Sequence, residues 1–187
     1  MSVSFVHLRV HTEYSLLDSV VRVPELMQAV AQAAMPAVAL TDESNLFALV
    51  KFYKAALAAG IKPLVGVDLW LADGGERDPP LRLTLLCQDE AGYLNLSRLV
   101  SRGYLQGKRR DTPLIERSWL DADAVAGLIA LSGAMEGEVG RSLLAGKISE
   151  ARRQVQAWQA LFGDRFYLEL QRIGRSGEEA YIAGALQ

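Results

Sequence analysis

This 187-residue sequence has only one cysteine, no long apolar run and little excess of either charge. The single cysteine, Cys87, excludes an internal disulfide and fits a reducing, cytoplasmic compartment. No stretch approaches the ~18 apolar residues of a membrane span, and the first residues do not resemble a signal peptide. With 20 basic and 22 acidic side chains, the net charge of -2 gives no general attraction to DNA.

The remaining composition is typical of one globular domain, which we predict over residues 1–187. Half of the residues are apolar and 22% are charged. Short β-like runs alternate with longer helical runs, an order that favours an α/β fold with a parallel sheet or barrel covered by helices. Strands are expected over 4–10, 37–41, 62–71, 81–87, 128–132 and 166–170, and helices over 24–34, 45–58, 89–104, 136–144, 148–162 and 177–187.

Helix boundary signals support part of this assignment. Pro24 suits the first turn of the first helix, Asp42 or Ser44 could cap the second, and Gly60 would end it. The expected last helix has no capping residue, and a barrel would need at least one more strand to close. We therefore expect the chain to be a fragment of a longer protein.

Polar residues follow several of the expected strands. In a parallel α/β barrel such residues gather at the carboxyl ends of the strands, where functional groups usually lie. Carboxylates and imidazoles that converge there could hold hard divalent cations. The candidates are His11, Glu13, Asp18, Asp42, Glu43, Asp68 and Glu169.

Each candidate also has a structural interpretation. Capping is the commonest role for an aspartate placed like Asp42, and Asp18 could cap a turn in the same way. Glu169 could pair with Arg172, and His7 lies in an alternating strand pattern that favours a histidine satisfied within the fold. These alternatives remain open on the residues alone.

Other catalytic patterns are absent. Ser132 follows a strand without a G-x-S-x-G elbow, no phosphate-binding glycine loop occurs, and Cys87 lies in an apolar run typical of an inert core thiol. One basic stretch could contact a phosphate backbone or an acidic partner, although a solvated helix face and loop would look the same. It consists of Arg98, Arg102, Lys108, Arg109 and Arg110.

Five segments, taken in order, resemble a known family. They read FVHLRVHTEYSLLDS, ALTDESNLFALVKFYKAALAAGIKPLVGVD, LTLLCQDEAGYLNLSRLVSRGY, LIALSGAMEGEVG and RFYLELQRIG. They are similar to the successive motifs of the PHP domain of bacterial DNA polymerase III alpha subunits, of the gammaproteobacterial type. The matching segments extend from about residue 5 to residue 174.

The resemblance implies a distorted (β/α)7 barrel, incomplete here at its carboxyl end. In some members, up to three divalent metals bind at the carboxyl ends of the strands, and the domain hydrolyses phosphoesters or acts as a 3′–5′ exonuclease. In others the domain stabilises the polymerase and docks a separate proofreading exonuclease subunit. The magnesium-dependent polymerase site, which contacts DNA, belongs to a palm domain elsewhere in such proteins.

Departures from the family motifs decide between these outcomes. Histidine ligands of the family are replaced by Arg9, Glu43, Arg82 and Ile173, and a cysteine is replaced by Ala134. Donor atoms that could bind a metal remain at His11, Asp18 and Asp68, and Glu43 could substitute for a lost histidine. These four residues are the weak candidates for metal ligands. An arginine could instead neutralise the remaining carboxylates. The resemblance thus implies no catalytic residue and no cofactor in this domain, with residual Zn, Mn or Mg not expected.

We therefore expect a noncatalytic domain of a cytoplasmic DNA polymerase III alpha subunit. It would act as a scaffold that binds the proofreading exonuclease subunit and the rest of the alpha subunit. The parent protein, rather than this domain, would bind DNA. The alternatives are a residually active phosphoesterase or exonuclease, and a domain of an error-prone polymerase paralogue. A DNA-contacting module through the basic stretch is a third possibility. No membrane association is expected.

Overall fold

The structure is a computed structural model that describes residues 5–72, 79–109 and 112–187. The chain divides into two compact units, Met1–Asp68 and Leu69–Gln187. Strand β2 (Lys62–Ala72) contributes to both units, and each unit is described by itself.

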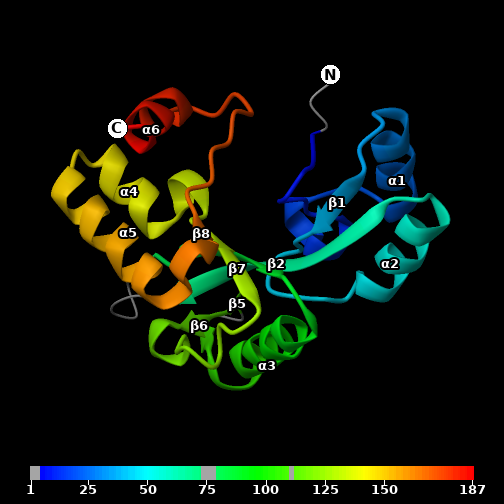
Figure 1. The fold of residues 1–187 in the computed structure, drawn as a ribbon, viewed down its shortest axis with the longest axis horizontal. Helices are drawn as coiled ribbons and strands as arrows, with labels where there is room; N and C mark the ends of the chain where they lie inside the picture. Colours follow the sequence, from blue (N-terminus) through cyan, green and yellow to red (C-terminus); the bar gives the residue numbers. More distant parts are fainter. Residues whose placement is uncertain (1–4, 73–78, 110–111) are drawn as a thin grey trace. The chain divides into compact units, whose positions relative to one another are not determined.

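The first unit packs two helices against a parallel strand pair. It contains the 3-10 helix η1 (Glu13–Asp18), α1 (Val23–Gln32), β1 (Ala37–Leu40), α2 (Leu49–Ala58) and the start of β2. In the β1–β2 pair, Ala37 lies opposite Lys62 and Leu40 opposite Val65. Helices α1 and α2 lie side by side (Figure 1). Their buried side chains form the core with β1, chiefly Val23, Met27, Val30, Val38, Leu40, Phe52 and Ala56.

Two local predictions for this unit are wrong. The expected strand over 4–10 is reduced, among its described residues, to one bridge between His7 and Val38. The segment still runs along β1, but the Val10 amide donates to the Thr41 hydroxyl (2.7 Å), which interrupts the regular ladder. The second helix begins at Leu49, and neither Asp42 nor Ser44 caps it, since its N-cap is Ala48 without a side-chain bond.

The second unit combines a mixed sheet with four helices among its described residues. The sheet contains the end of β2, β3 (Leu81–Cys87), β6 (Ile115–Glu116), β7 (Leu128–Leu131) and β8 (Phe166–Tyr167). Helix α3 (Glu90–Gln106) packs against β3, and α4 (Glu138–Leu144) packs against both α5 (Ile148–Phe162) and α6 (Glu178–Ala185) (Figure 1). The 3-10 helices are η2 (Arg117–Trp119), η3 (Ala134–Glu136) and η4 (Gly163–Arg165).

Strand pairing in this unit corrects the expectation of a parallel sheet. Strand β3 pairs with β7 in antiparallel fashion, whereas β7 pairs with β8 and β2 with β6 in parallel. After α3, the short strands β4 (Lys108–Arg109) and β5 (Thr112–Pro113) form an antiparallel pair. The α/β class and the helix over 148–162 are confirmed.

Across the described ranges, no helix is both long enough and apolar enough to cross a bilayer.

Candidate functional site

Backbone contacts bring the first candidate residues together within the first unit. The segment that carries Arg9 and His11 is held along β1 by the Ala39 amide, which donates to the His7 carbonyl (2.9 Å). On the other side, Asp68 of β2 forms a parallel bridge with Glu43. These pairings place Arg9 and His11 within reach of the Asp68 side chain, 57 to 59 residues away in the sequence.

Asp68 is the centre of a buried charged cluster. Its side chain is fully buried, and its Oδ2 atom accepts hydrogen bonds from Arg9 Nε (2.9 Å) and from the His11 ring through Nε2 (2.9 Å). Arg9 Nη2 lies 2.7 Å from the same oxygen, and the Arg9 side chain is only 11% exposed. A buried carboxylate needs a cationic partner to replace its lost hydration. Arg9 supplies that positive charge.

His11 joins Asp68 to a second carboxylate. Its Nε2 atom faces Asp68, and its Nδ1 atom is hydrogen-bonded to Asp18. Burial lowers the pKa of His11, but the hydrogen bond and charge of Asp68 and the hydrogen bond to Asp18 outweigh burial, so the pKa lies above its ordinary value. With His11 protonated, two cations balance two carboxylates.

This geometry fits an ion-paired cluster better than a metal centre. A histidine ligates a metal through an unprotonated nitrogen, and both ring nitrogens of His11 face carboxylates. The Arg9 guanidinium has no lone pair to offer. Within the described ranges, no three or more His, Cys, Asp or Glu side chains form a group suited to a metal ion. The absence of a bound metal stays a prediction.

Asp42 has a structural role that differs from the predicted helix cap. Its buried carboxylate accepts hydrogen bonds from the Thr12 amide (2.6 Å), the Thr12 hydroxyl (2.8 Å) and the Ser15 hydroxyl (2.7 Å). Asp42 therefore fixes the turn that follows His11. Sequence reasoning missed Thr12 and Ser15, whose only signal is two hydroxyl residues three positions apart after His11.

The other three positions at which we predict a lost ligand lie in the second unit and do not share one environment. Arg82 is buried in β3, with its guanidinium carbon 3.4 Å from the ring centre of Trp70, a cation–π contact that sequence reasoning missed. Ala134 is buried and packs with Tyr181. Ile173 is 64% exposed. Aliphatic side chains at 134 and 173 offer no donor atom to a cation.

Other candidates take surface roles. Glu13 pairs with Lys51 (2.8 Å), and this hydrogen bond lowers the pKa of the Glu13 carboxyl. Arg172 pairs with Glu179 (2.7 Å) and not, as the alternative interpretation held, with Glu169. His7 is exposed and contacts the Phe5 ring edge-on, with ring centres 4.8 Å apart.

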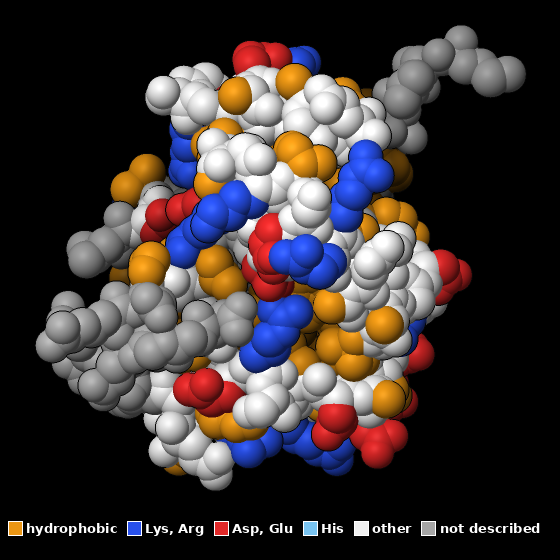
Figure 2. Space-filling model, turned by 90° about the vertical axis from the view of Figure 1, so that its left-hand side faces the viewer, with side chains coloured by type: hydrophobic (Ala, Val, Ile, Leu, Met, Phe, Trp, Pro, Cys, Tyr) orange, Lys and Arg blue, Asp and Glu red, His pale blue; other side chains and the backbone are white. Residues whose placement is uncertain are grey.

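The basic stretch is only partly defined. Arg98 donates to Asn95 (3.2 Å), and Arg102 donates to Gln106 (3.0 Å) and stacks on Trp119 at 4.1 Å. Arg110 and the side chains of Lys108 and Arg109 lie outside the described residues. On the face drawn in Figure 2, basic and acidic side chains are intermixed with hydrophobic ones. A contact of this stretch with nucleic acid stays a prediction.

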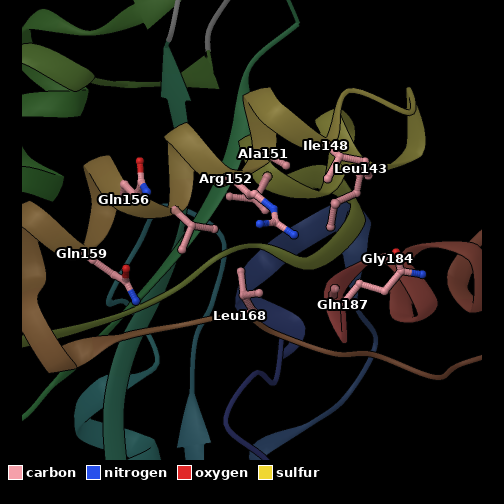
Figure 3. Close-up of a pocket in the computed structure, with 12 residues that line it drawn as sticks. Leu143, Ile148, Ala151, Arg152, Gln156, Gln159, Leu168, Gly184 and Gln187 are labelled. Carbon is pink, nitrogen blue, oxygen red and sulfur yellow. The ribbon is translucent and has the colours of Figure 1, made fainter.

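A groove in the second unit contains none of the predicted site residues. It has a volume of about 360 Å³ and lies between α4, α5, α6 and the segment after β8. Figure 3 shows the apolar side chains Leu143, Ile148 and Leu168 and the polar side chains Arg152 and Gln156, all of which line the groove. The residues that line the groove thus include none of the predicted metal-site positions.

The sequence as a whole matches one protein family. The profile of the PHP domain family matches residues 7–173. This chain belongs to the PHP domain family. It is 50% identical over 186 residues to the DNA polymerase III subunit alpha of Pseudomonas aeruginosa, and 43% identical over 183 residues to that of Escherichia coli K12. These matches cover 100% and 98% of this chain, respectively, but only 16% of each relative.

The fold of this chain is similar to that of a solved structure. A proposed metal-dependent phosphoesterase from Bifidobacterium adolescentis has a TM-score of 0.54 at 10% identity, covering 97% of this chain and 94% of that one. A likeness at this identity shows the fold alone. The PHP chain is homologous to the N-terminal region of DNA polymerase III subunit alpha, and it spans about a sixth of the length of those relatives.

Proposed function

We propose that this chain is a noncatalytic PHP domain of a DNA polymerase III alpha subunit, which stabilises the polymerase and docks the proofreading exonuclease subunit. Template-directed nucleotide transfer would then belong to other parts of the longer protein. The similarity to alpha subunits over the full length of this chain supports the assignment to the polymerase.

The contact between Arg9 and Asp68 is the main support for a noncatalytic role. Hydrolysis by a metal cluster requires each cation to be held by several ligands and to activate a water molecule. Here the carboxylate of Asp68 accepts a hydrogen bond from Arg9 and a second one from His11. A cation at that place would have to displace a guanidinium that already neutralises the carboxylate. The arginine thus takes over the charge-balancing role of a metal.

A metal titration tests the noncatalytic role. The unchanged protein is compared with an Arg9→His/Glu43→His/Arg82→His variant, which returns histidine to three replaced positions. A matched control carries three histidines at exposed sites, Glu90→His, Arg98→His and Arg153→His. Calorimetry with Mn²⁺ and Zn²⁺ and elemental analysis measure binding, and a 3′-labelled oligonucleotide measures exonuclease activity.

We expect no tight stoichiometric metal and no hydrolysis by the unchanged protein. The triple-histidine variant should bind metal more tightly than the surface control, because the imidazoles at positions 9 and 43 would lie beside the carboxylate of Asp68. Stoichiometric Zn²⁺ or Mn²⁺ in the unchanged protein, together with metal-dependent hydrolysis, would identify a residually active phosphoesterase or exonuclease and overturn the proposal.

A further inference from the structure

Helix α3 carries two exposed arginines whose hydrogen-bond partners are neutral. Arg98 and Arg102 are four positions apart, which places them on the same side of the helix. Among the described residues neither is paired with a carboxylate, since Arg98 donates to Asn95 (3.2 Å) and Arg102 to Gln106 (3.0 Å). Residues 91–110 contain five basic residues and no acidic one, although the whole chain has a net charge of -2. The exposed side of α3 is therefore locally positive.

Arg98 is held in place by a chain of hydrogen bonds. The side-chain amide of Asn95 donates to the backbone carbonyls of Asp123 (2.9 Å) and Ala126 (3.1 Å). Because both bonds use the amide nitrogen, the amide oxygen of Asn95 is left to accept from Arg98 Nη1. The other N–H groups of this guanidinium can contact a ligand. A side chain that is ordered in advance loses less entropy when it binds.

Arg102 forms a flat platform on the same side of α3. Its guanidinium carbon lies 4.1 Å from the centre of the Trp119 ring, and its Nε atom donates to Gln106. The Arg102 side chain is exposed, so the guanidinium face turned away from Trp119 can stack against a further ring. Its two terminal nitrogens keep N–H groups that match the paired oxygens of a phosphate.

We propose that Arg98 and Arg102, with Trp119 supporting Arg102, bind single-stranded DNA. We call these three residues the α3 surface. The two guanidinium groups would contact phosphates of the backbone, and an unpaired base would stack on the platform of Arg102. The choice of DNA as the ligand rests on the proposed function, because a domain of a DNA polymerase subunit works next to DNA.

Two other polyanions match the α3 surface less completely. In a DNA duplex the bases are stacked on one another, so no free base is presented to the platform of Arg102. An acidic peptide would neutralise the arginines, but aspartate and glutamate side chains have no ring to stack on a guanidinium. A single strand uses both the charge of the α3 surface and its flat guanidinium face.

Fluorescence anisotropy tests the inference. A fluorescein-labelled oligothymidylate of about 20 nucleotides is titrated with the full chain at salt concentrations from about 25 to about 200 mM. The test variants are Arg98→Ala, Arg102→Ala and the double variant, and Arg102→Lys keeps the charge without the flat guanidinium. Arg153→Ala on α5 is the matched control, because Arg153 is also exposed (67%) but is paired with Glu150. Circular dichroism checks that each variant is folded.

We expect the unchanged chain to bind the oligonucleotide more weakly as salt increases. The slope of log affinity against log salt should be about 0.7 for each phosphate contacted, so the double variant should reduce it by about 1.4. Arg102→Lys should keep the slope and lower the affinity about fivefold or more, because the stacking face is lost. Arg153→Ala should change neither the slope nor the affinity.

Three results would overturn the inference. The first is no salt-dependent binding by the unchanged chain, or binding that the double variant retains in full. The second is a duplex of the same length bound at least as tightly as the single strand, which would identify a general phosphate contact. The third is labelled polyglutamate bound more tightly than the oligonucleotide, which would identify an acidic protein as the partner. None of these results would change the noncatalytic role, which the metal titration tests separately.

Discussion

Substitution of Asp68 by asparagine tests the charged cluster most directly. The change keeps the size and shape of the side chain and removes only its negative charge. Arg9 is then left with 11% of its side chain exposed and without the carboxylate that its Nε and Nη2 atoms contact. Breaking one partner of a buried ion pair typically costs about 3–5 kcal/mol, because the other charge stays buried without compensation.

That cost should be visible in urea unfolding. With an m-value of about 2 kcal/mol/M for a chain of this size, the loss corresponds to a midpoint about 1.5–2.5 M lower. Far-UV circular dichroism is the appropriate signal, since all three tryptophans, at 70, 119 and 158, lie in the second unit. Arg9→Met combined with Asp68→Asn should cost less than the sum of the single changes, because the two side chains interact directly.

An exposed ion pair of the same unit provides the control. Glu13 and Lys51 have side chains 33% and 47% exposed. Glu13→Gln should therefore leave the urea midpoint almost unchanged, because an exposed ion pair is screened by solvent. If Asp68→Asn proves as mild as Glu13→Gln, the cluster does not stabilise the first unit and the reasoning above is wrong.

Three further outcomes are expected. Because the pKa of His11 is raised in the folded protein, protonated His11 should stabilise it fully below the ordinary histidine pKa, and this stabilisation should be lost as the pH rises through the folded-state pKa. Urea midpoints measured from pH 6 to pH 9 should therefore fall, and His11→Gln should abolish the fall. An equal fall in both proteins would contradict this expectation. Burial, and to a smaller extent the charge of Asp89, raises the pKa of Cys87 to about 11. Iodoacetamide at pH 8 should therefore react with Cys87 roughly 100-fold more slowly than with an ordinary thiol of pKa 9.0. Equal reaction rates in the native protein and in urea would refute this prediction. Asp42→Ala should lower the free energy of unfolding by about 3 kcal/mol or more in the same assay, because the Thr12 and Ser15 donors lose their acceptor. A loss below about 1 kcal/mol would show that water replaces the carboxylate as acceptor.

The amino-acid sequence determined the elements whose signals are local. The helix over 148–162 and the strands over 62–71 and 81–87 follow from apolar periodicity, and the structure has them within one residue. The motifs also indicated the PHP family, which the profile match confirms, and they predict that Arg9, Glu43 and Arg82 stand where the family has histidine. Each of these inferences depends only on residues that are close together in the sequence, either within one element or within one motif.

Tertiary structure decided how distant segments meet. Periodicity describes which face of an element is apolar, but it does not specify the neighbour, so the antiparallel pairing of β3 with β7 could not be predicted. The same holds for Asp42, whose carboxylate binds Thr12 and Ser15 rather than a helix end. The ion pair of Arg9 with Asp68 joins residues 59 positions apart, and only burial within one unit makes their opposite charges interact strongly.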